Sequence, residues 1–293
     1  MSQIMTALSY APTTLAYLLA FSFVAFPFGA MLQERKAFRD VGLGFLGSFK
    51  AFLFIQIWML TSALAVAINL PWYLLGFDVR KRCNTFYESN IGIQNSKVFM
   101  GPVKVLGEQN IPKDGKPHIY IANHQSMIDI CVLYYLRVPF VWISKKVVGY
   151  IPGVGQIMFL SGHILLERKG KASIKQMYSD AKNRLSDGFN IFIFPQGTRE
   201  RTEVLPFKHG AFSMAMSENV DVVPVSIELS DDAWKRFFGY GYVFGVEEAK
   251  SKPAAIITVH PVMKTSDYNG DKEKMMAAGQ KIVYSVLGDK KRM

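Results

Sequence analysis

The residues "NHQSMID", at positions 123–129, place a histidine and an aspartate where an apolar run gives way to a helical pattern. Residues 118–123 are typical of a buried strand, and residues 127–136 are expected to be helical. If both were in one regular helix, His124 and Asp129 would point about 140° apart and could not meet. They can meet because His124 precedes the helix.

Two interpretations fit this spacing. In the first, Asp129 binds one imidazole nitrogen of His124, fixes its tautomer and leaves the other nitrogen free to accept a proton. The nearby helix N-terminus would oppose protonation and keep the resting ring basic. In the second, Ser126 is the N-cap and Asp129 completes a capping box with no chemical role. The spacing alone leaves both interpretations open.

Two arginines end other apolar runs and suggest an anion site. The segment "IFIFPQGTR", residues 191–199, runs from a predicted strand into a glycine turn and Arg199. Glycine lets backbone amides approach an oxyanion, and arginine offers a planar fork to phosphate. Arg168 ends the run "HILLER". The alternative for each segment is a turn with a solvated arginine. Beside His124, the two arginines could hold a phosphate while a nearby hydroxyl is deprotonated.

The elements that must position these residues alternate between strands and helices. Residues 172–187 form the clearest helix, with an apolar face ending before Gly188. Strand and helix alternation predicts an α/β fold with a mixed, largely parallel sheet covered by helices. Ligands then bind beyond the carboxyl ends of the strands. The predicted strands are residues 118–123, 140–144, 163–166, 191–194, 222–227 and 255–260; the helical face is Ile174, Met177, Tyr178, Ala181 and Leu185.

Two uncharged runs precede this region, at about residues 12–32 and 51–77. Half of the 293 residues are hydrophobic and 19% are charged, and the mean hydropathy is +0.14. Each run reaches the roughly twenty residues that cross a bilayer core. Residues 1–82 are therefore predicted to be a membrane-anchoring region with a pair of embedded helices, and residues 83–293 a second domain. Alternatives are buried core helices, or a hairpin that enters one leaflet.

Charge and missing motifs narrow the function. The net charge of +11 suits anionic lipid headgroups or phosphorylated substrates. No zinc spacing or RNA-binding signature supports nucleic acid as a partner. No metal-ligand cluster, G-x-S-x-G elbow, phosphate-binding P-loop or complete G-x-G-x-x-G is present. The cysteines, Cys83 and Cys131, form no C-x-x-C pair, which suits a reducing compartment.

Together these segments resemble the membrane-bound glycerolipid acyltransferases, the family of lysophosphatidate (1-acylglycerol-3-phosphate) acyltransferases. That family's blocks run in the order NHxxxxD, K…P…G, G-x-x-x-x-x-R, FPEGTR and V-P-V. The resemblance covers about residues 100–260. The matching positions are residues 123–129, then Lys145, Pro152 and Gly155, then residues 162–168, 194–199 and 223–225.

The resemblance implies transfer of an acyl group from acyl-CoA or acyl carrier protein to the free sn-2 hydroxyl of 1-acylglycerol 3-phosphate. The product is phosphatidate, and no covalent acyl-enzyme forms. His124 would be the general base and Asp129 its orienting partner. No cofactor or metal is implied, because acyl-CoA is a co-substrate. The residues expected to bind substrate are Lys145, Arg168, Gln196, Gly197, Thr198 and Arg199.

One residue departs from the pattern, since Gln196 stands where the family has glutamate. A glutamine is neutral and donates as well as accepts hydrogen bonds, so it could change acceptor choice. Alternatives are therefore acylation of glycerol 3-phosphate or of a larger lysophospholipid, and a non-catalytic membrane lipid-binding protein. The tail at residues 290–293 looks like a dilysine signal of endoplasmic reticulum proteins with a cytosolic active site; a bacterial inner membrane is the other expectation. No protein partner is predicted.

Overall fold

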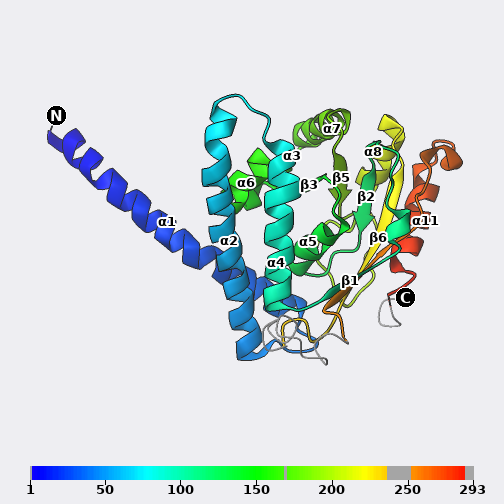
Figure 1. The fold of residues 1–293 in the computed structure, drawn as a ribbon, viewed down its shortest axis with the longest axis horizontal. Helices are drawn as coiled ribbons and strands as arrows, with labels where there is room; N and C mark the ends of the chain where they lie inside the picture. The colour runs from blue at the N-terminus through cyan, green and yellow to red at the C-terminus, as the bar shows by residue number, and fades with distance from the viewer. Residues whose placement is uncertain (1, 168–169, 236–251, 288–293) are drawn as a thin grey trace.

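A seven-stranded sheet forms the centre of the protein (Figure 1). The computed structural model describes residues 2–167, 170–235 and 252–287. Within them the strand order is β1-β7-β6-β2-β5-β3-β4. The strands are β1 Val103–Leu106, β2 Ile119–Ala122, β3 Phe140–Lys145, β4 Ile164–Leu166, β5 Asn190–Ile193, β6 Val222–Leu229 and β7 Ala255–Val259.

The sheet is mixed and largely parallel, as predicted. Strands β4, β3, β5, β2 and β6 run parallel to one another, whereas β7 runs antiparallel to β6 and carries β1 parallel to itself. The sequence did not predict β1. Its side chains alternate between half-buried and exposed at the edge of the sheet, so it lacks the continuous apolar run that marks the central strands.

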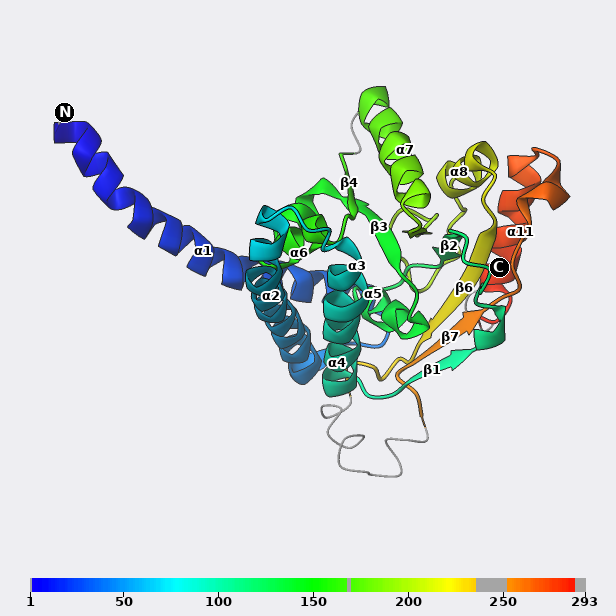
Figure 2. The same ribbon diagram turned by 45° about the horizontal axis from the view of Figure 1, so that its top comes forward.

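Helices cover both faces of the sheet (Figure 2). Alternate side chains of β2 divide between two cores: Tyr120 and Ala122 pack in one, Ile119 and Ile121 in the other. This alternation follows from the twofold repeat of a strand. The first core contains side chains of α2 Gly44–Leu74, α4 Ser89–Phe99 and α5 Ile128–Leu133, and the second contains side chains of α7 Lys171–Ser186, α8 Gly210–Glu218 and α11 Lys272–Tyr284.

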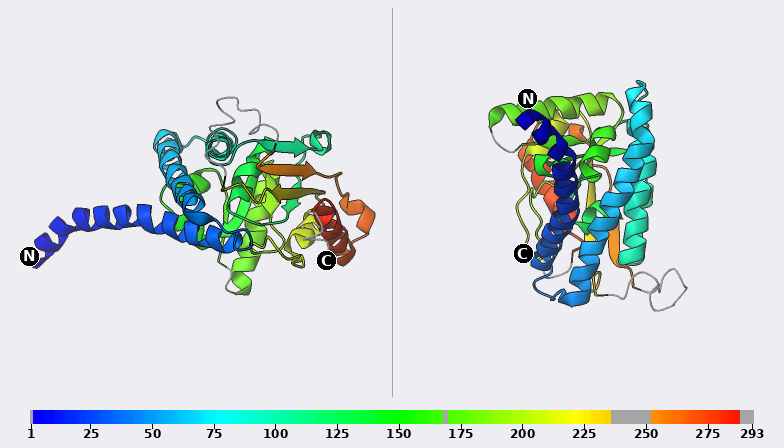
Figure 3. Two further views of the ribbon diagram at one scale, coloured as in Figure 1. Left: turned by 90° about the horizontal axis from the view of Figure 1, so that it is seen from below. Right: turned by 90° about the vertical axis from the view of Figure 1, so that its left-hand side faces the viewer.

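The predicted helical pair at the N-terminus is present as α1 Ser2–Ala37 and α2. The N-terminal part of α1 projects away from the body, and its C-terminal part packs beside α2 (Figure 3). The first predicted run, residues 12–32, lies within α1, but the side chains before residue 20 are outside the described residues. Among the described residues, α2 is long and apolar enough to cross a membrane.

Both helices differ from their predicted bounds. Helix α1 continues past residue 32 through polar residues to Ala37, and α2 begins at Gly44, before the predicted residue 51. Helix α2 ends at Leu74, before the predicted residue 77, and Gly76 follows with a φ of +87°. A continuous helical segment then runs through α3 Arg80–Arg82, the π-helical stretch η1 Cys83–Glu88 and α4. The suggested boundary between residues 82 and 83 falls inside this segment, so the domain division stays a prediction.

Two predicted helices form with local differences. Helix α7 matches residues 172–187 within one residue at each end, and Ala181 and Leu185 are buried as predicted; Ile174 is 47% exposed. Helix α5 begins at Ile128, with Met127 and not Ser126 at the N-cap position. The 3₁₀ turn η3 Tyr134–Leu136 completes the predicted helix. The other elements are α6 Val154–Leu160 and the 3₁₀ turns η2 Glu108–Asn110, η4 Lys146–Tyr150 and η5 Thr265–Tyr268.

Candidate active site

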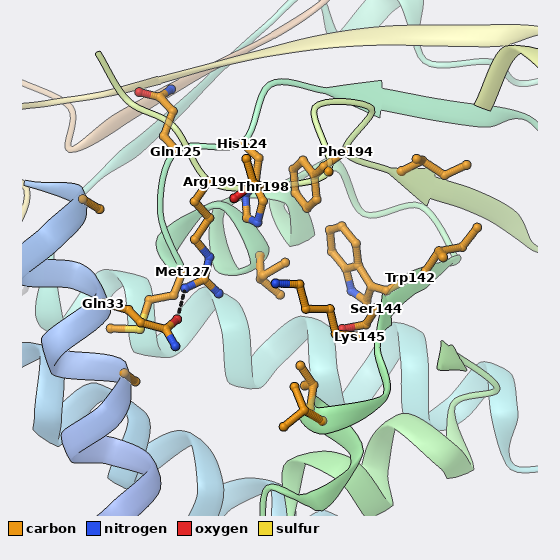
Figure 4. A pocket seen from close by; sticks show the side chains of 18 of the residues that line it. Gln33, His124, Gln125, Met127, Trp142, Ser144, Lys145, Phe194, Thr198 and Arg199 are labelled. Carbon is orange, nitrogen blue, oxygen red and sulfur yellow. Dashed lines mark hydrogen bonds between the residues drawn. The ribbon is translucent and has the colours of Figure 1, made fainter. Parts of the chain in front are cut away.

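Three neighbouring strands deliver the candidate residues to one edge of the sheet (Figure 4). His124 follows β2, residues 194–199 follow β5, and Lys145 is the last residue of β3. Because these strands are parallel neighbours, their carboxyl ends meet at the same edge. The structure therefore brings together His124, Lys145 and Arg199, which line one cavity. Arg168 lies outside the described residues.

His124 and Asp129 meet as the spacing allowed. The Nδ1 atom of His124 lies 2.7 Å from Oδ2 of Asp129, which is fully buried. No hydrogen bond reaches the Nε2 atom from any residue that the structure describes, and the side chain faces the cavity. Burial lowers the pKa of His124 below its ordinary value, Asp129 partly opposes this shift, and the charges of Arg199 and Lys145 lower the pKa further. The resting imidazole is neutral, with one nitrogen available to take a proton.

Asp129 also caps the turn. Its Oδ2 atom accepts hydrogen bonds from the backbone N–H groups of Gln125, at 2.6 Å, and Ser126, at 2.9 Å. The hydroxyl of Ser126 accepts from the N–H of Ile128 at 3.1 Å. Only half of the predicted capping box is present, because Asp129 accepts the N–H of Ser126 but the Ser126 hydroxyl bonds the N–H of Ile128 and not that of Asp129. The capping contact and the His–Asp contact are not alternatives, because one carboxylate makes both.

Asn123 fastens the turn to the neighbouring strand. Its side-chain amide donates to the carbonyl of Ile227 at 2.9 Å and accepts from the N–H of Ile227 at 2.8 Å. Gln125 also donates to that carbonyl. The side chain of Asn123 thus pairs with β6 as a backbone would, and it fixes where His124 leaves the sheet.

A stack of aromatic rings holds the plane of the histidine. The ring of Phe194 lies parallel to the imidazole of His124, with centroids 3.9 Å apart and 11° between planes. Trp142 stacks on the other face of Phe194 at 5.6 Å and 11°. The indole N–H of Trp142 donates to the hydroxyl of Tyr134 at 3.1 Å. Rings stacked on an imidazole favour its cationic form when it gains a proton. Sequence reasoning did not single out Trp142, although Phe194 belongs to a quoted motif.

Gln196 keeps one contact and leaves one group unpaired. Its side-chain oxygen accepts the backbone N–H of His124 at 2.6 Å. A carboxylate oxygen could accept that bond equally well. The Nε2 amide of Gln196 is buried and has no hydrogen-bond partner in the part of the chain that the structure describes. An unsatisfied buried donor costs about 1–3 kcal/mol. Replacing glutamate with glutamine therefore lowers the stability of this turn but keeps the hydrogen bond to His124.

The arginine end of the site depends on α1. The guanidinium of Arg199 donates to the side-chain oxygen of Gln33 at 3.0 Å (Figure 4). Gly197 has a φ of +74°, and a Cβ atom there would lie 2.9 Å from Nζ of Lys208. The N–H of Gly197 donates to the carbonyl of Phe194 at 3.0 Å, so this predicted anion donor already has an acceptor. Gln33 was not anticipated, because 166 residues separate it from Arg199.

The cavity combines apolar and basic walls. It has a volume of about 1030 Å³, which is at the upper limit for small-ligand sites. Its apolar wall includes Phe26 on α1, Trp58 on α2 and Met158 on α6; its basic wall includes Lys36, Arg39, Lys145, Arg199 and Lys208, and Thr198 also lines it. An amphiphile with an anionic headgroup matches both walls.

The part of the chain that holds most of the site matches a known protein family. Residues 102–228 match the family model named Acyltransferase, which includes both the NHQSMID turn and the FPQGTR segment. Residues 102–228 belong to the acyltransferase family. This acyltransferase domain contains β1 to β5 and all of β6 except its last residue, Leu229. The site residues described above that lie outside it belong to α1, to α2 and to the turn between them.

Named relatives share the acyltransferase domain. A Chlamydomonas reinhardtii protein named 1-acyl-sn-glycerol-3-phosphate acyltransferase is 36% identical over 155 residues, which are 53% of this chain and 47% of that protein. The Saccharomyces cerevisiae protein of that name is 39% identical over 137 residues, 45% of each chain. The human beta form is 29% identical over 189 residues, 59% of this chain and 68% of that one. The chain thus spans about half the length of the first two relatives.

A solved structure shares the fold over most of the chain. The crystal structure of the 1-acyl-sn-glycerophosphate acyltransferase PlsC from Thermotoga maritima superposes with a TM-score of 0.55. It covers 77% of this chain and 91% of that one, at 22% identity. The similarity confirms the predicted α/β fold.

Proposed function

We propose that this protein transfers an acyl group from a thioester, acyl-CoA or acyl carrier protein, to the free sn-2 hydroxyl of 1-acylglycerol 3-phosphate, forming phosphatidate. The observation that carries the proposal is the free Nε2 atom of a neutral His124 on a cavity that also holds Arg199 and Lys145. The names of the relatives support the same acceptor.

The reaction needs one proton to move twice. As the acceptor oxygen attacks the thioester carbonyl carbon, Nε2 of His124 takes the hydroxyl proton. The tetrahedral intermediate then collapses, the C–S bond breaks, and the imidazolium returns the proton to the thiolate. Asp129 accepts the Nδ1–H bond and stabilises the transient imidazolium. No redox step or additional reactant is required.

Direct transfer is favoured because the described thiols are poor nucleophiles. Cys131 is fully buried, and burial raises the pKa of its thiol well above the ordinary value. Burial also raises the pKa of Cys83 to about 12, with Glu88 adding to the shift. A thiolate, not a thiol, is the attacking form, so an acyl-cysteine intermediate is disfavoured.

The two walls of the cavity support one orientation of the lipid in this proposal. The phosphate lies with Arg199 and Lys145, where charge and the guanidinium fork suit its oxygens. The acyl chains lie against the apolar wall that α1 and α2 provide. Arg168 is proposed for the phosphate from the sequence motif alone.

We also propose that the protein is membrane-bound through its N-terminal helices. The support is the length and apolar character of α2, and the apolar wall that α1 and α2 give to a lipid-sized cavity. The basic tail favours the endoplasmic reticulum with a cytosolic active site, and a bacterial inner membrane is the alternative. The described residues end before that tail.

A second candidate keeps the chemistry and changes the acceptor. The unpaired amide of Gln196 beside the turn of His124 is the observation that favours it. In that case the acceptor is glycerol 3-phosphate or a lysophospholipid with a larger headgroup.

The test is thiol release from acyl-CoA by the full-length protein in detergent, measured across lysophosphatidate, glycerol 3-phosphate and lysophosphatidylcholine. We expect lysophosphatidate to give the highest kcat/KM, and His124→Ala to lower kcat by about 10²- to 10⁴-fold, the range for a lost general base. Equal rates for His124→Ala and the parent would reject the base. Equal kcat/KM for lysophosphatidate and lysophosphatidylcholine would reject the acceptor.

A further inference from the structure

The turn that carries His124 has a side-chain acceptor for each of its backbone N–H groups. Two of these acceptors, Asp129 and Ser126, belong to the turn itself. The others come from distant parts of the chain. In order, the N–H of His124 is accepted by Gln196, those of Gln125 and Ser126 by Asp129, that of Met127 by Glu34, and that of Ile128 by Ser126.

Glu34, near the C-terminal end of α1, has no part in the proposed reaction. Its Oε1 atom accepts the N–H of Met127 at 2.9 Å. Its Oε2 atom accepts the hydroxyl of Ser126 at 2.6 Å and the indole N–H of Trp234 at 3.1 Å. The side chain is fully buried. A buried carboxylate is costly unless donors surround it, and here both oxygens have them.

These bonds make Glu34 part of the chain of contacts that orients the turn. The Ser126 hydroxyl donates to Glu34 and therefore presents its lone pairs to the N–H of Ile128. If the carboxylate were removed, the N–H of Met127 would lose its acceptor and the hydroxyl of Ser126 would be free to rotate. The backbone that sets the His124–Asp129 distance would then be less constrained.

Gln33, which precedes Glu34 in α1, contacts the part of the site that contains Arg199. Gln33 accepts from Arg199. Burial raises the pKa of Glu34, and the hydrogen bonds from Met127 and Ser126 together with the charge of Arg199 oppose that rise. The same helix lines the cavity with Phe26 and Ala30. The C-terminal part of α1, residues 26–34, thus contacts the histidine turn, the arginine and the cavity.

We propose that Glu34 is a positioning residue through which α1 holds the His124 turn in its reactive geometry. The catalytic base is then correctly placed only when the C-terminal part of α1 packs against the turn. This inference rests on the proposed function, since the geometry matters for proton transfer from an acceptor hydroxyl. Glu34 acts through the backbone of residues 126–127 and does not touch the reacting atoms.

The first experiment separates positioning from binding. Glu34→Gln turns one acceptor oxygen into a donor that faces other donors. We expect kcat to fall by at least about tenfold, the scale of a small misplacement of a catalytic group, while KM for acyl-CoA and for lysophosphatidate changes by less than about threefold. Glu108→Gln, an exposed glutamate on η2, removes the same charge and should match the parent.

A second measurement reports on His124 without turnover. Diethyl pyrocarbonate modifies neutral imidazoles, and mass spectrometry gives the rate at each histidine. His209, whose side chain is 54% exposed, is an internal standard. A loosened turn should expose His124 more often, so Glu34→Gln should speed its modification relative to His209 by at least about threefold.

The outcomes distinguish this inference from the proposed function. A folded Glu34→Gln protein with the kcat of the parent, or with unchanged reactivity of His124, would overturn the positioning role. If the parent showed no acyl transfer with any acceptor, the proposed function would fail and the modification rate alone would decide on Glu34. If Glu34→Gln did not fold, Ser126→Ala would remove only the bridging hydroxyl, and an unchanged kcat would overturn the inference.

Discussion

Two histidines of the described residues, His124 and His163, each lie within hydrogen-bond distance of a buried carboxylate, and their surroundings differ. His124 lies 2.7 Å from Asp129, and His163 lies 2.8 Å from Glu88. The side chain of His163 is fully buried, and its Nδ1 atom accepts the backbone N–H of Trp142 at 3.0 Å. Both nitrogens of His163 are therefore occupied, whereas Nε2 of His124 has no partner among the described residues.

The difference shows what makes a histidine–carboxylate pair a candidate base. Distance and burial are similar in the two pairs. A proton acceptor must also have a free nitrogen on a space that substrate can enter. His124 meets this condition at the cavity, and His163 instead ties β3 to the π-helical stretch that carries Glu88. The second pair is a structural connection.

The largest expected effect comes from changing the carboxylate of each pair. Asp129→Asn should lower kcat by about 10²- to 10⁴-fold, because the amide no longer stabilises the imidazolium and favours the wrong tautomer. Glu88→Gln is the matched change in the other pair and should leave kcat within about threefold. Steady-state thiol release measures both. A similar fall in kcat in both variants would show that the two histidine–carboxylate pairs do not differ in their role in catalysis.

The second largest effect is expected from His163→Ala, which should lower the free energy of unfolding and leave kcat nearly unchanged. His163→Ala leaves the carboxyl of Glu88 and the N–H of Trp142 without partners inside the protein. Each unsatisfied buried group costs about 1–3 kcal/mol, so the free energy of unfolding should fall by about 2 kcal/mol or more. Denaturant unfolding in detergent measures this change. A fall in kcat per folded molecule as large as that of Asp129→Asn would contradict the structural role.

The smallest expected effect is a shift in the pH dependence of kcat/KM, which depends on the pKa of His124. Because burial lowers its pKa, His124 is neutral and active above that pKa, and activity is lost as pH falls through it. Gln196→Glu puts a carboxylate beside the backbone of His124, which should raise the pKa and move the acid limb of kcat/KM up by about 0.5–1 pH unit. A limb that stays in place or moves down would show that the added charge does not reach the imidazole.

The lowered pKa of His124 also makes the stability of the protein depend on pH. Below pH 6.5, the ordinary pKa of histidine, His124 is protonated in the unfolded chain but stays neutral in the folded protein until the pH falls below its lowered pKa. Stability therefore falls as pH drops below about 6.5. In Gln196→Glu the folded pKa is higher, so the loss attributable to His124 should be smaller.

Much of the fold was predictable because its signals are local. The central strands are uninterrupted apolar runs, and α7 has a helical apolar face, so their bounds agree with the structure within one or two residues. The contact between His124 and Asp129 was also predictable as an option, since both partners belong to one turn. What the spacing did not reveal is that Asp129 caps the turn with the same oxygen.

The rest depends on contacts that no local pattern encodes. Glu34 and Ser126 are 92 positions apart, and only the return of α1 to the sheet brings them together. A weak signal existed, because Glu34 is the first acidic residue of the chain and follows an uncharged run. Ile174 was assigned to a buried face but is exposed, since the start of α7 projects beyond the sheet (Figure 2).

The turn at residues 124–128 has irregular backbone geometry, yet each of its amides is engaged by a side chain. Loops usually exchange their amide protons with solvent quickly, because few of those groups are bonded. This turn should retain its protons as a helix interior does. On the timescale of hydrogen exchange it belongs to the slow core of the protein, and its protection would report on how firmly α1 is seated.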